Sequence, residues 1–263
     1  MKALFFIAFI VYAAAVVLQF SGIAFRKEKL LKLSWILFVL AFAVHSLFII
    51  VRGAKAGRIP LSNQFEFANG FAWGVALMLI VLRGRLKGDW LSVAAMPMTL
   101  LVMTYAALQP MEIHDLMPAL RSGWFGIHIG SAVLSYSAFV IAGCIGLRYL
   151  IVHKKSGGAE KQKLEQMDYL SYRLVAFGFL FLTVVILSGA IWAEQAWSSF
   201  WTWDPKEVWA LITWIIYAVF LHLRLVAKHK GVRMAWFLVI AVPVVFFTFA
   251  GVNTLIPGMH SYG

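Results

Sequence analysis

Two histidines at the ends of apolar segments are the residues in this sequence best placed to bind a metal. His128 lies near one end of such a segment in "WFGIHIG", and His260 lies beyond the last segment in "GMHSYG". Because neutral imidazole is a common axial ligand of haem iron, two histidines from different helices could hold one haem between them. The alternative interpretation is a pair of interfacial histidines that bond to water or to carbonyl groups.

Two further histidines lie inside apolar segments, where an ionisable side chain is costly and often marks a function. His222 follows Glu207 by 15 residues, which places it about 22 Å below the outer surface at about 1.5 Å per residue. By the same rise, His45 lies about 18 Å from the inner end of its segment. A haem shared between the two histidines and a neutral histidine that bonds across helices both remain open. The other three histidines are interpreted as surface residues of connecting segments, and they are His114, His153 and His229.

Six of the eleven tryptophans fall within residues 192–214, and they are Trp192, Trp197, Trp201, Trp203, Trp209 and Trp214. Asp204, Pro205 and Glu207 have a structural explanation as a helix start with a capping box, which requires no ligand. An aromatic belt would spread tryptophans over many membrane spans. A concentrated apolar surface on one loop suits a large planar ligand, and with the flanking histidines it indicates haem.

The elements that must position these residues are membrane helices. Hydrophobic residues make up 62% of the 263 residues, charged residues make up 13%, and the mean hydropathy is +0.86. Apolar segments long enough to cross a bilayer occur at about 3–24, 33–52, 66–82, 90–108, 124–151, 174–192, 206–226 and 233–252. Because they lack the alternation of barrel strands, we predict an all-α fold, a polytopic membrane helical bundle of about eight transmembrane helices. We expect one integral-membrane domain over residues 1–263.

Basic residues are distributed unevenly between the predicted loops. With the N-terminus outside, 17 of the 23 lysines and arginines fall in inner loops, so we predict both termini on the non-cytoplasmic side and the 192–209 loop outside. This excess accounts for the net charge of +12 without nucleic-acid binding. Arg52, Lys55 and Arg58 lie outside against the rule, which suggests a task for them. For the longest inner loop, residues 153–173, we predict a short helix along the membrane surface.

Two further features limit the alternatives. Cys144 is the single cysteine, which excludes an internal disulfide, a CxxC pair and a zinc cluster of cysteines. The first apolar segment lacks a small-residue cleavage site, so we interpret it as a retained helix.

The stretch "WTWDPKEVWALITWIIYAVFLH" resembles the tryptophan-rich WWD signature of haem-handling membrane proteins, in particular the CcsA (ResC) branch of cytochrome c biogenesis. "GRIPLSNQFEFANGFAW" (57–73), "PALRSGWFGIHIGSAVLSYSAF" (118–139) and "GVNTLIPGMHSYG" (251–263) are similar to that family's second loop, fifth span and C-terminal end. The resemblance therefore covers nearly all of the chain. Phe65 stands where the family pattern leads us to expect tyrosine.

The resemblance assigns roles to particular residues. It implies that His128 and His260 are axial ligands of haem iron at the outer site, and that His222 belongs to a membrane haem site. The WWD residues match Trp201, Trp203, Asp204 and Trp209, which would present the haem together with Trp197. His45 matches a second-span position, and its role is left open. None of these residues acts as an acid or base in this interpretation.

The function that the resemblance implies is cytochrome c biogenesis in the cytoplasmic membrane of a bacterium or a thylakoid-type membrane. Haem b would cross the membrane and be presented outside for attachment to a CxxCH segment of apocytochrome c. Because it has no CxxCH of its own, the chain would be the haem handler and not the cytochrome. The resemblance implies a haem lyase component that works with a CcsB (ResB) membrane subunit. The alternatives are a HemX-like haem carrier or regulator without ligation activity, a b-type electron-transfer subunit, and a transporter of another apolar substrate.

Overall fold

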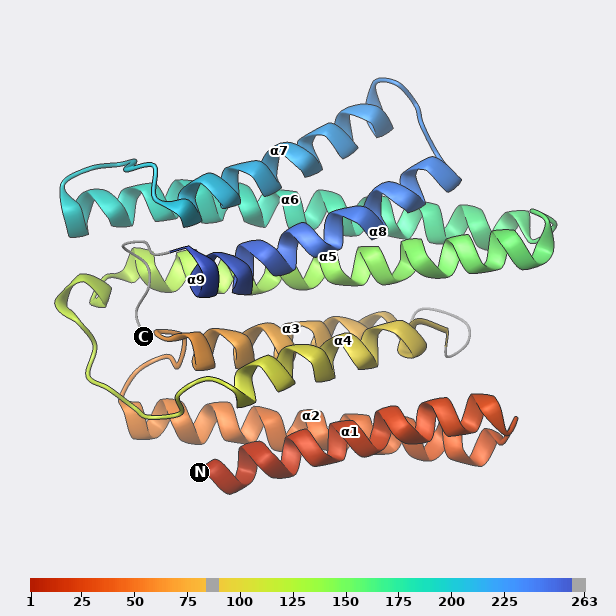
Figure 1. Ribbon diagram of the computed structural model, residues 1–263, viewed down its shortest axis with the longest axis horizontal. Coiled ribbons are helices and arrows are strands. Elements are labelled where there is room, and N and C mark those ends of the chain that lie inside the picture. The colour runs from red at the N-terminus through yellow and green to blue at the C-terminus, as the bar shows by residue number, and fades with distance from the viewer. Residues whose placement is uncertain (84–89, 257–263) are drawn as a thin grey trace. The chain divides into compact units, whose positions relative to one another are not determined.

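The computed structural model describes residues 1–83 and 90–256, which form long helices joined by loops (Figure 1). Eight of the described helical segments are long and apolar enough to cross a membrane, so the predicted all-α, multi-pass membrane fold is confirmed. These segments are α1 (Lys2–Ala24), α2 (Glu28–Ala56), α3 (Gln64–Arg83), α4 (Trp90–Ala107), α5 (Gly123–Ser156), α6 (Lys161–Trp197), α7 (Pro205–Leu225) and Val232–Leu255. The last comprises α8 (Val232–Phe246), a π-helical turn (Phe247–Gly251) and α9 (Val252–Leu255).

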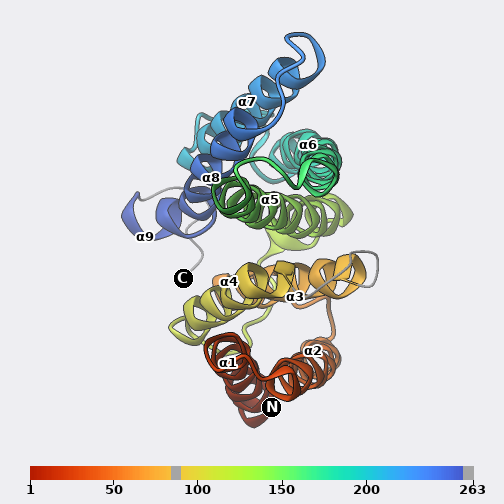
Figure 2. The same ribbon diagram turned by 90° about the vertical axis from the view of Figure 1, so that its right-hand side faces the viewer.

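The helices pack as two compact units, Met1–Leu116 and Met117–Gly263, the second being described as far as residue 256. In unit 1, α1 packs against α2, α3 packs against α4, and the two pairs meet through α1 with α4 and α2 with α3. In unit 2, α5 lies between α6 and α8, and α7 packs on α6 (Figure 2). The single haem-handling domain over residues 1–263 stays a prediction.

The buried face of α2 combines apolar and polar side chains. Its buried residues recur every three or four positions, the spacing that puts side chains on one helix face. They are Ser34, Phe38, Ala41, His45, Phe48 and Arg52. Three of the six are polar, so unit 1 encloses groups that need hydrogen-bond partners in its interior.

A buried ion cluster joins the predicted outer ends of α2 and α3. Arg52 Nε and Arg58 Nη1 each donate to Glu66, on its two different carboxylate oxygens, at 2.8 Å. Arg52 also donates to the carbonyl oxygens of Met111 and Glu112, at 2.8 and 3.0 Å. Arginines that lie against the positive-inside rule thus have a structural task, because they attach the connection after α4 to α2 and α3.

Helix α5 packs closely against α8 at Gly146. A Cβ atom added to Gly146 would lie 2.9 Å from the carbonyl oxygen of Ala235 in α8, a distance that no side chain tolerates. The missing side chain therefore lets the two backbones approach, as small residues often do between membrane helices.

The predicted surface helix within residues 153–173 is wrong, because α6 runs without interruption from Lys161 to Trp197. Residues 161–177 contain no glycine or proline that would break a helix. The buried residues Leu164, Met167 and Ser171 continue at helical spacing into Val175. The charged segment is therefore the first part of the membrane-spanning helix itself.

Candidate functional site

The start of α7 is fixed by a capping box, as the sequence predicts. Asp204 Oδ1 accepts from the backbone N–H of Lys206 at 2.9 Å. Glu207 Oε2 accepts from the backbone N–H of Asp204 at 3.2 Å and from that of Thr202 at 2.9 Å. Two acidic side chains thus hold the backbone of residues 202–204 against the helix end, where the helix dipole also favours negative charge.

The capping box presents Trp203 to the surroundings. Trp203 has a φ of +60°, in the left-handed region that non-glycine residues rarely adopt, and its side chain is 72% exposed. Its ring meets that of the half-buried Trp201 edge-on, with centroids 5.8 Å apart and planes at 88°. A strained backbone that exposes a large aromatic ring is typical of a binding site.

The remaining tryptophans of residues 192–214 have packing partners. Trp192 is buried, with its ring centroid 5.6 Å from that of Trp197. The Trp209 ring packs against Phe247 at 4.3 Å, next to the π-helical turn. Trp214 Nε1 donates to the hydroxyl of Thr183 at 2.9 Å. The tryptophan-rich segment therefore contains both packed tryptophans and a smaller exposed group.

His128 is held in a defined orientation between α5 and α6. Its Nδ1 lies 2.8 Å from the carbonyl oxygen of Val185, which can only accept, so Nδ1 carries the proton. The ring centroid lies 6.1 Å from that of Trp192, and the side chain is half-buried. A histidine whose Nδ1–H bonds to a carbonyl bears its lone pair on Nε2, the arrangement found in most metal-ligating histidines.

Gly189 provides the space for the His128 ring, a role that sequence reasoning missed. A Cβ atom at position 189 would lie 2.8 Å from His128 Nδ1, too close for both to remain in place. The one signal in the sequence was a glycine inside an apolar helical segment, "LSGAIW", where glycine often indicates a close approach. Val185 contributes only its carbonyl oxygen, which no sequence pattern identifies.

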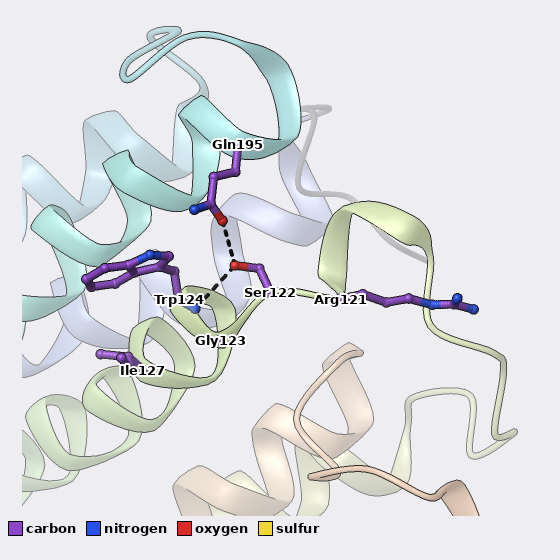
Figure 3. A pocket seen from close by; sticks show the side chains of 6 residues that line it. All are labelled: Arg121, Ser122, Gly123, Trp124, Ile127 and Gln195. Carbon is purple, nitrogen blue, oxygen red and sulfur yellow. Dashed lines mark hydrogen bonds between the residues drawn. The ribbon is translucent and has the colours of Figure 1, made fainter.

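A cavity of about 470 Å³ lies at the N-terminus of α5. It is lined by Arg121, Ser122, Gly123, Trp124, Ile127 and Gln195. Ser122, the N-cap of α5, donates to Gln195 Oε1 at 2.8 Å and accepts from the backbone N–H of Trp124 (Figure 3). Arg121 points away from Trp124 and Ile127 (Figure 3). Because Trp124 and His128 are four residues apart, they lie on one face of α5, and the cavity borders that face.

The other predicted ligands have different surroundings. His222 is exposed near the inner end of α7, as the predicted orientation defines it, and His45 is completely buried in unit 1. His260 lies outside the described residues. Within residues 1–83 and 90–256, no group of three or more His, Cys, Asp or Glu side chains could hold a metal ion. The structure thus places Trp201, Trp203 and Asp204 together at the start of α7, and His128 with Trp192 between α5 and α6.

Comparisons with known proteins relate the chain to cytochrome c assembly. The sequence profile of a family described as "Cytochrome C assembly protein" matches residues 61–260. "Cytochrome c biogenesis protein CcsA" of Chlamydomonas reinhardtii is 37% identical over 82% of this chain and 64% of its own length. The proteins of the same name from Guillardia theta and Marchantia polymorpha are 31% and 30% identical, over 98% and 99% of this chain and 94% of each relative.

Proposed function

The chain belongs to the family of CcsA-type cytochrome c assembly proteins, and from this membership we propose that it moves haem b across the membrane and presents it for attachment to apocytochrome c. The acceptor is a CxxCH segment, whose two thiols react with the haem vinyl groups. In each addition the S–H bond and the π bond of the vinyl group break while a C–S bond and a C–H bond form, so no electrons are gained or lost. The task of the protein is therefore to orient the reactants.

The observation that supports this proposal best is the bond from His128 Nδ1–H to the Val185 carbonyl. It fixes the tautomer and the orientation that an axial ligand needs, in a half-buried position beside a cavity. We propose that His128 and His260 hold the haem iron at the outer site. His222 contributes to a second haem site within the membrane.

The WWD residues complete the outer site. Trp203, with its exposed ring, lies against the face of the haem, and Trp197, Trp201 and Trp209 extend this apolar surface. Asp204 fixes the loop through the capping box. The edge of the haem that carries the vinyl groups is left open to the incoming thiols.

The chain acts together with a CcsB (ResB) subunit, and the two form a haem lyase in a bacterial cytoplasmic or thylakoid-type membrane. Helix α7 supports a partner in the membrane, because it buries only Thr213, Tyr217 and Phe220 within the described residues. Its other apolar side chains are left to contact lipid or a second subunit.

The test uses the full chain co-expressed with its partner subunit and an apocytochrome c. We expect that His128→Ala and His260→Ala each reduce the haem absorbance of the purified complex and abolish covalent cytochrome c. His114→Ala is the matched control, because His114 is exposed and its hydrogen bond to Arg58 uses the backbone carbonyl, which the substitution keeps. Unchanged haem spectra and cytochrome c output in both variants would refute the proposal. A wild-type complex that binds haem but yields no cytochrome c would favour a HemX-like carrier.

A further inference from the structure

The interior of unit 1 contains polar side chains whose hydrogen-bonding atoms have no partner among the described residues. They are both ring nitrogens of His45, the hydroxyl of Tyr12 and Oδ1 of Asn69. The three side chains come from α2, α1 and α3, and each is at most 2% exposed. The rings of Tyr12 and His45 meet edge-on with centroids 6.0 Å apart, and the Asn69 side chain lies beside His45, although no hydrogen bond of normal geometry joins them. Three helices therefore bring unsatisfied polar atoms to one place.

These atoms provide both donors and acceptors. A neutral imidazole has one N–H donor and one nitrogen acceptor, and a phenol has one of each. Asn69 Nδ2 already donates to the carbonyl oxygen of Phe65 at 2.7 Å, which leaves Oδ1 as an acceptor. A buried polar group without a hydrogen bond costs about 1–3 kcal/mol, so several at one point would strongly favour the binding of a small ligand that satisfies them.

The three side chains of the cluster are uncharged polar groups, which suit a neutral ligand better than an ion. Glu66, the buried carboxylate of α3, already accepts from Arg52, Arg58 and the backbone and hydroxyl of Ser62. A metal ion would need several anionic or imidazole ligands, and His45 belongs to no such group within residues 1–83 and 90–256. The ligand must therefore be small and neutral, and it must both donate and accept, which are the properties of water.

We propose that His45, Tyr12 and Asn69 bind internal water in the membrane interior of unit 1. A buried water typically makes about three hydrogen bonds to groups of this kind, and about one or two molecules would satisfy the cluster. The sequence left a haem shared by His45 and His222 open, and this site gives His45 a different ligand. The His45 ring is completely buried, so a haem could reach it only if the helices around it moved apart.

Other polar side chains of unit 1 extend the water site toward the predicted inner end. Ser34 Oγ donates to Gln19 Oε1 at 3.1 Å, while Gln19 Nε2 and Ser92 Oγ have no partner in the described part of the chain. Tyr12 and Gln19 are seven residues apart on the buried face of α1, which corresponds to about 10 Å along the helix. Gln19 and Ser92 thus continue the series of unsatisfied polar atoms from Tyr12 toward the predicted inner end.

The test is radiolytic oxidation of the full chain in lipid nanodiscs after mixing with ¹⁸O-labelled water. Bound water next to Tyr12 delivers hydroxyl radicals to that ring although no bulk solvent reaches it. We expect Tyr12 to be oxidised, and we expect the oxygen added to its ring to become ¹⁸O only slowly after mixing. Phe38 should not be oxidised, although its equally buried ring lies 5.0 Å from that of Tyr12. Tyr12 without oxidation would overturn the proposal.

Two substitutions of similar size separate water binding from packing. His45→Gln keeps a donor and an acceptor and should retain the label on Tyr12, whereas His45→Leu should lose it. Loss of the label in both variants, or in neither, would contradict the role of His45.

A second measurement is the haem absorbance of His45→Gln purified with the partner subunit, which should equal that of the wild type. If the wild-type complex shows haem absorbance and the His45→Gln complex does not, His45 is an iron ligand and the proposal is overturned. Absence of haem from the wild-type complex would refute the proposed function and leave the labelling result to decide on the water site.

Discussion

His45 and His128 are the same residue type in opposite surroundings. Each ring lies beside an aromatic side chain at nearly the same distance, 6.0 Å to Tyr12 and 6.1 Å to Trp192. His128 is half-buried, and a backbone carbonyl fixes its Nδ1. His45 is fully enclosed, and neither of its nitrogens has a hydrogen bond to a described residue. The surroundings therefore decide the size of the ligand, which is a large planar molecule at His128 in our proposal and water at His45.

The ion pairs of the two units differ in the same way. In unit 1, the side chains of Arg52 and Glu66 are 1% and 0% exposed. In unit 2, Arg224 and Asp168 are 9% and 12% exposed, and Asp168 also accepts from the backbone N–H of Gly231 between α7 and α8. The ion pair of unit 1 is therefore completely enclosed, whereas the ion pair of unit 2 is slightly more exposed.

Removing the acid of each pair should give the largest difference between the units. Glu66→Gln leaves two buried arginines without a counter-ion, and we expect the free energy of unfolding to fall by about 3–5 kcal/mol. Asp168→Asn removes charge-assisted hydrogen bonds near the surface, and we expect a fall of about 1–3 kcal/mol. Chemical unfolding in detergent micelles measures both values.

Glu112→Gln is the control for this pair of variants. The Glu112 side chain is 58% exposed, and its ion pair with Lys2 is long at 3.7 Å. We therefore expect no change in the free energy of unfolding. If Glu66→Gln and Asp168→Asn lowered the free energy of unfolding equally, the difference in burial between the two ion pairs would have no effect on stability.

The sequence predicted the helices well because hydropathy and length decide membrane spans. All eight expected segments are present, and the error at residues 153–173 arose because charge was taken as the end of a span. The capping box at Asp204 was also predictable, because its signal is local. The orientation of the His128 ring was not predictable, because it depends on a carbonyl 57 residues away and on the absence of a side chain at Gly189.

Gly189→Ala tests how closely unit 2 controls His128. The added methyl group would lie 2.8 Å from Nδ1, so the ring must move and the bond to the Val185 carbonyl is lost. We expect a loss of stability of about 1–3 kcal/mol, typical of overpacking. In the co-expression assay, haem absorbance and cytochrome c output should fall as they do in His128→Ala.

Gly130→Ala is the matched control on α5, because a Cβ atom at position 130 meets nothing within 4 Å. An alanine there should leave the haem absorbance unchanged and stabilise the helix by about 0.5–1 kcal/mol. If Gly189→Ala also kept a wild-type haem spectrum, the orientation of His128 would not matter for haem binding. The fixed Nδ1 of His128 would then not explain why His128 and His45 bind different ligands.

Among the destabilising substitutions, those of Asp204 give the smallest expected loss of stability, and they separate the structural role of the WWD acid from its charge. Asp204→Ala removes the N-cap of α7 and should lower the free energy of unfolding by about 1 kcal/mol, whereas asparagine caps about as well as aspartate. Asp204→Asn should therefore keep both the stability and the position of the exposed Trp203. If cytochrome c output falls in Asp204→Ala and is normal in Asp204→Asn, the acid acts only by holding the loop, as we propose. A loss of output in a stable Asp204→Asn would instead show that the negative charge itself is required, and each unit would then depend on a buried carboxylate, Glu66 in unit 1 and Asp204 in unit 2.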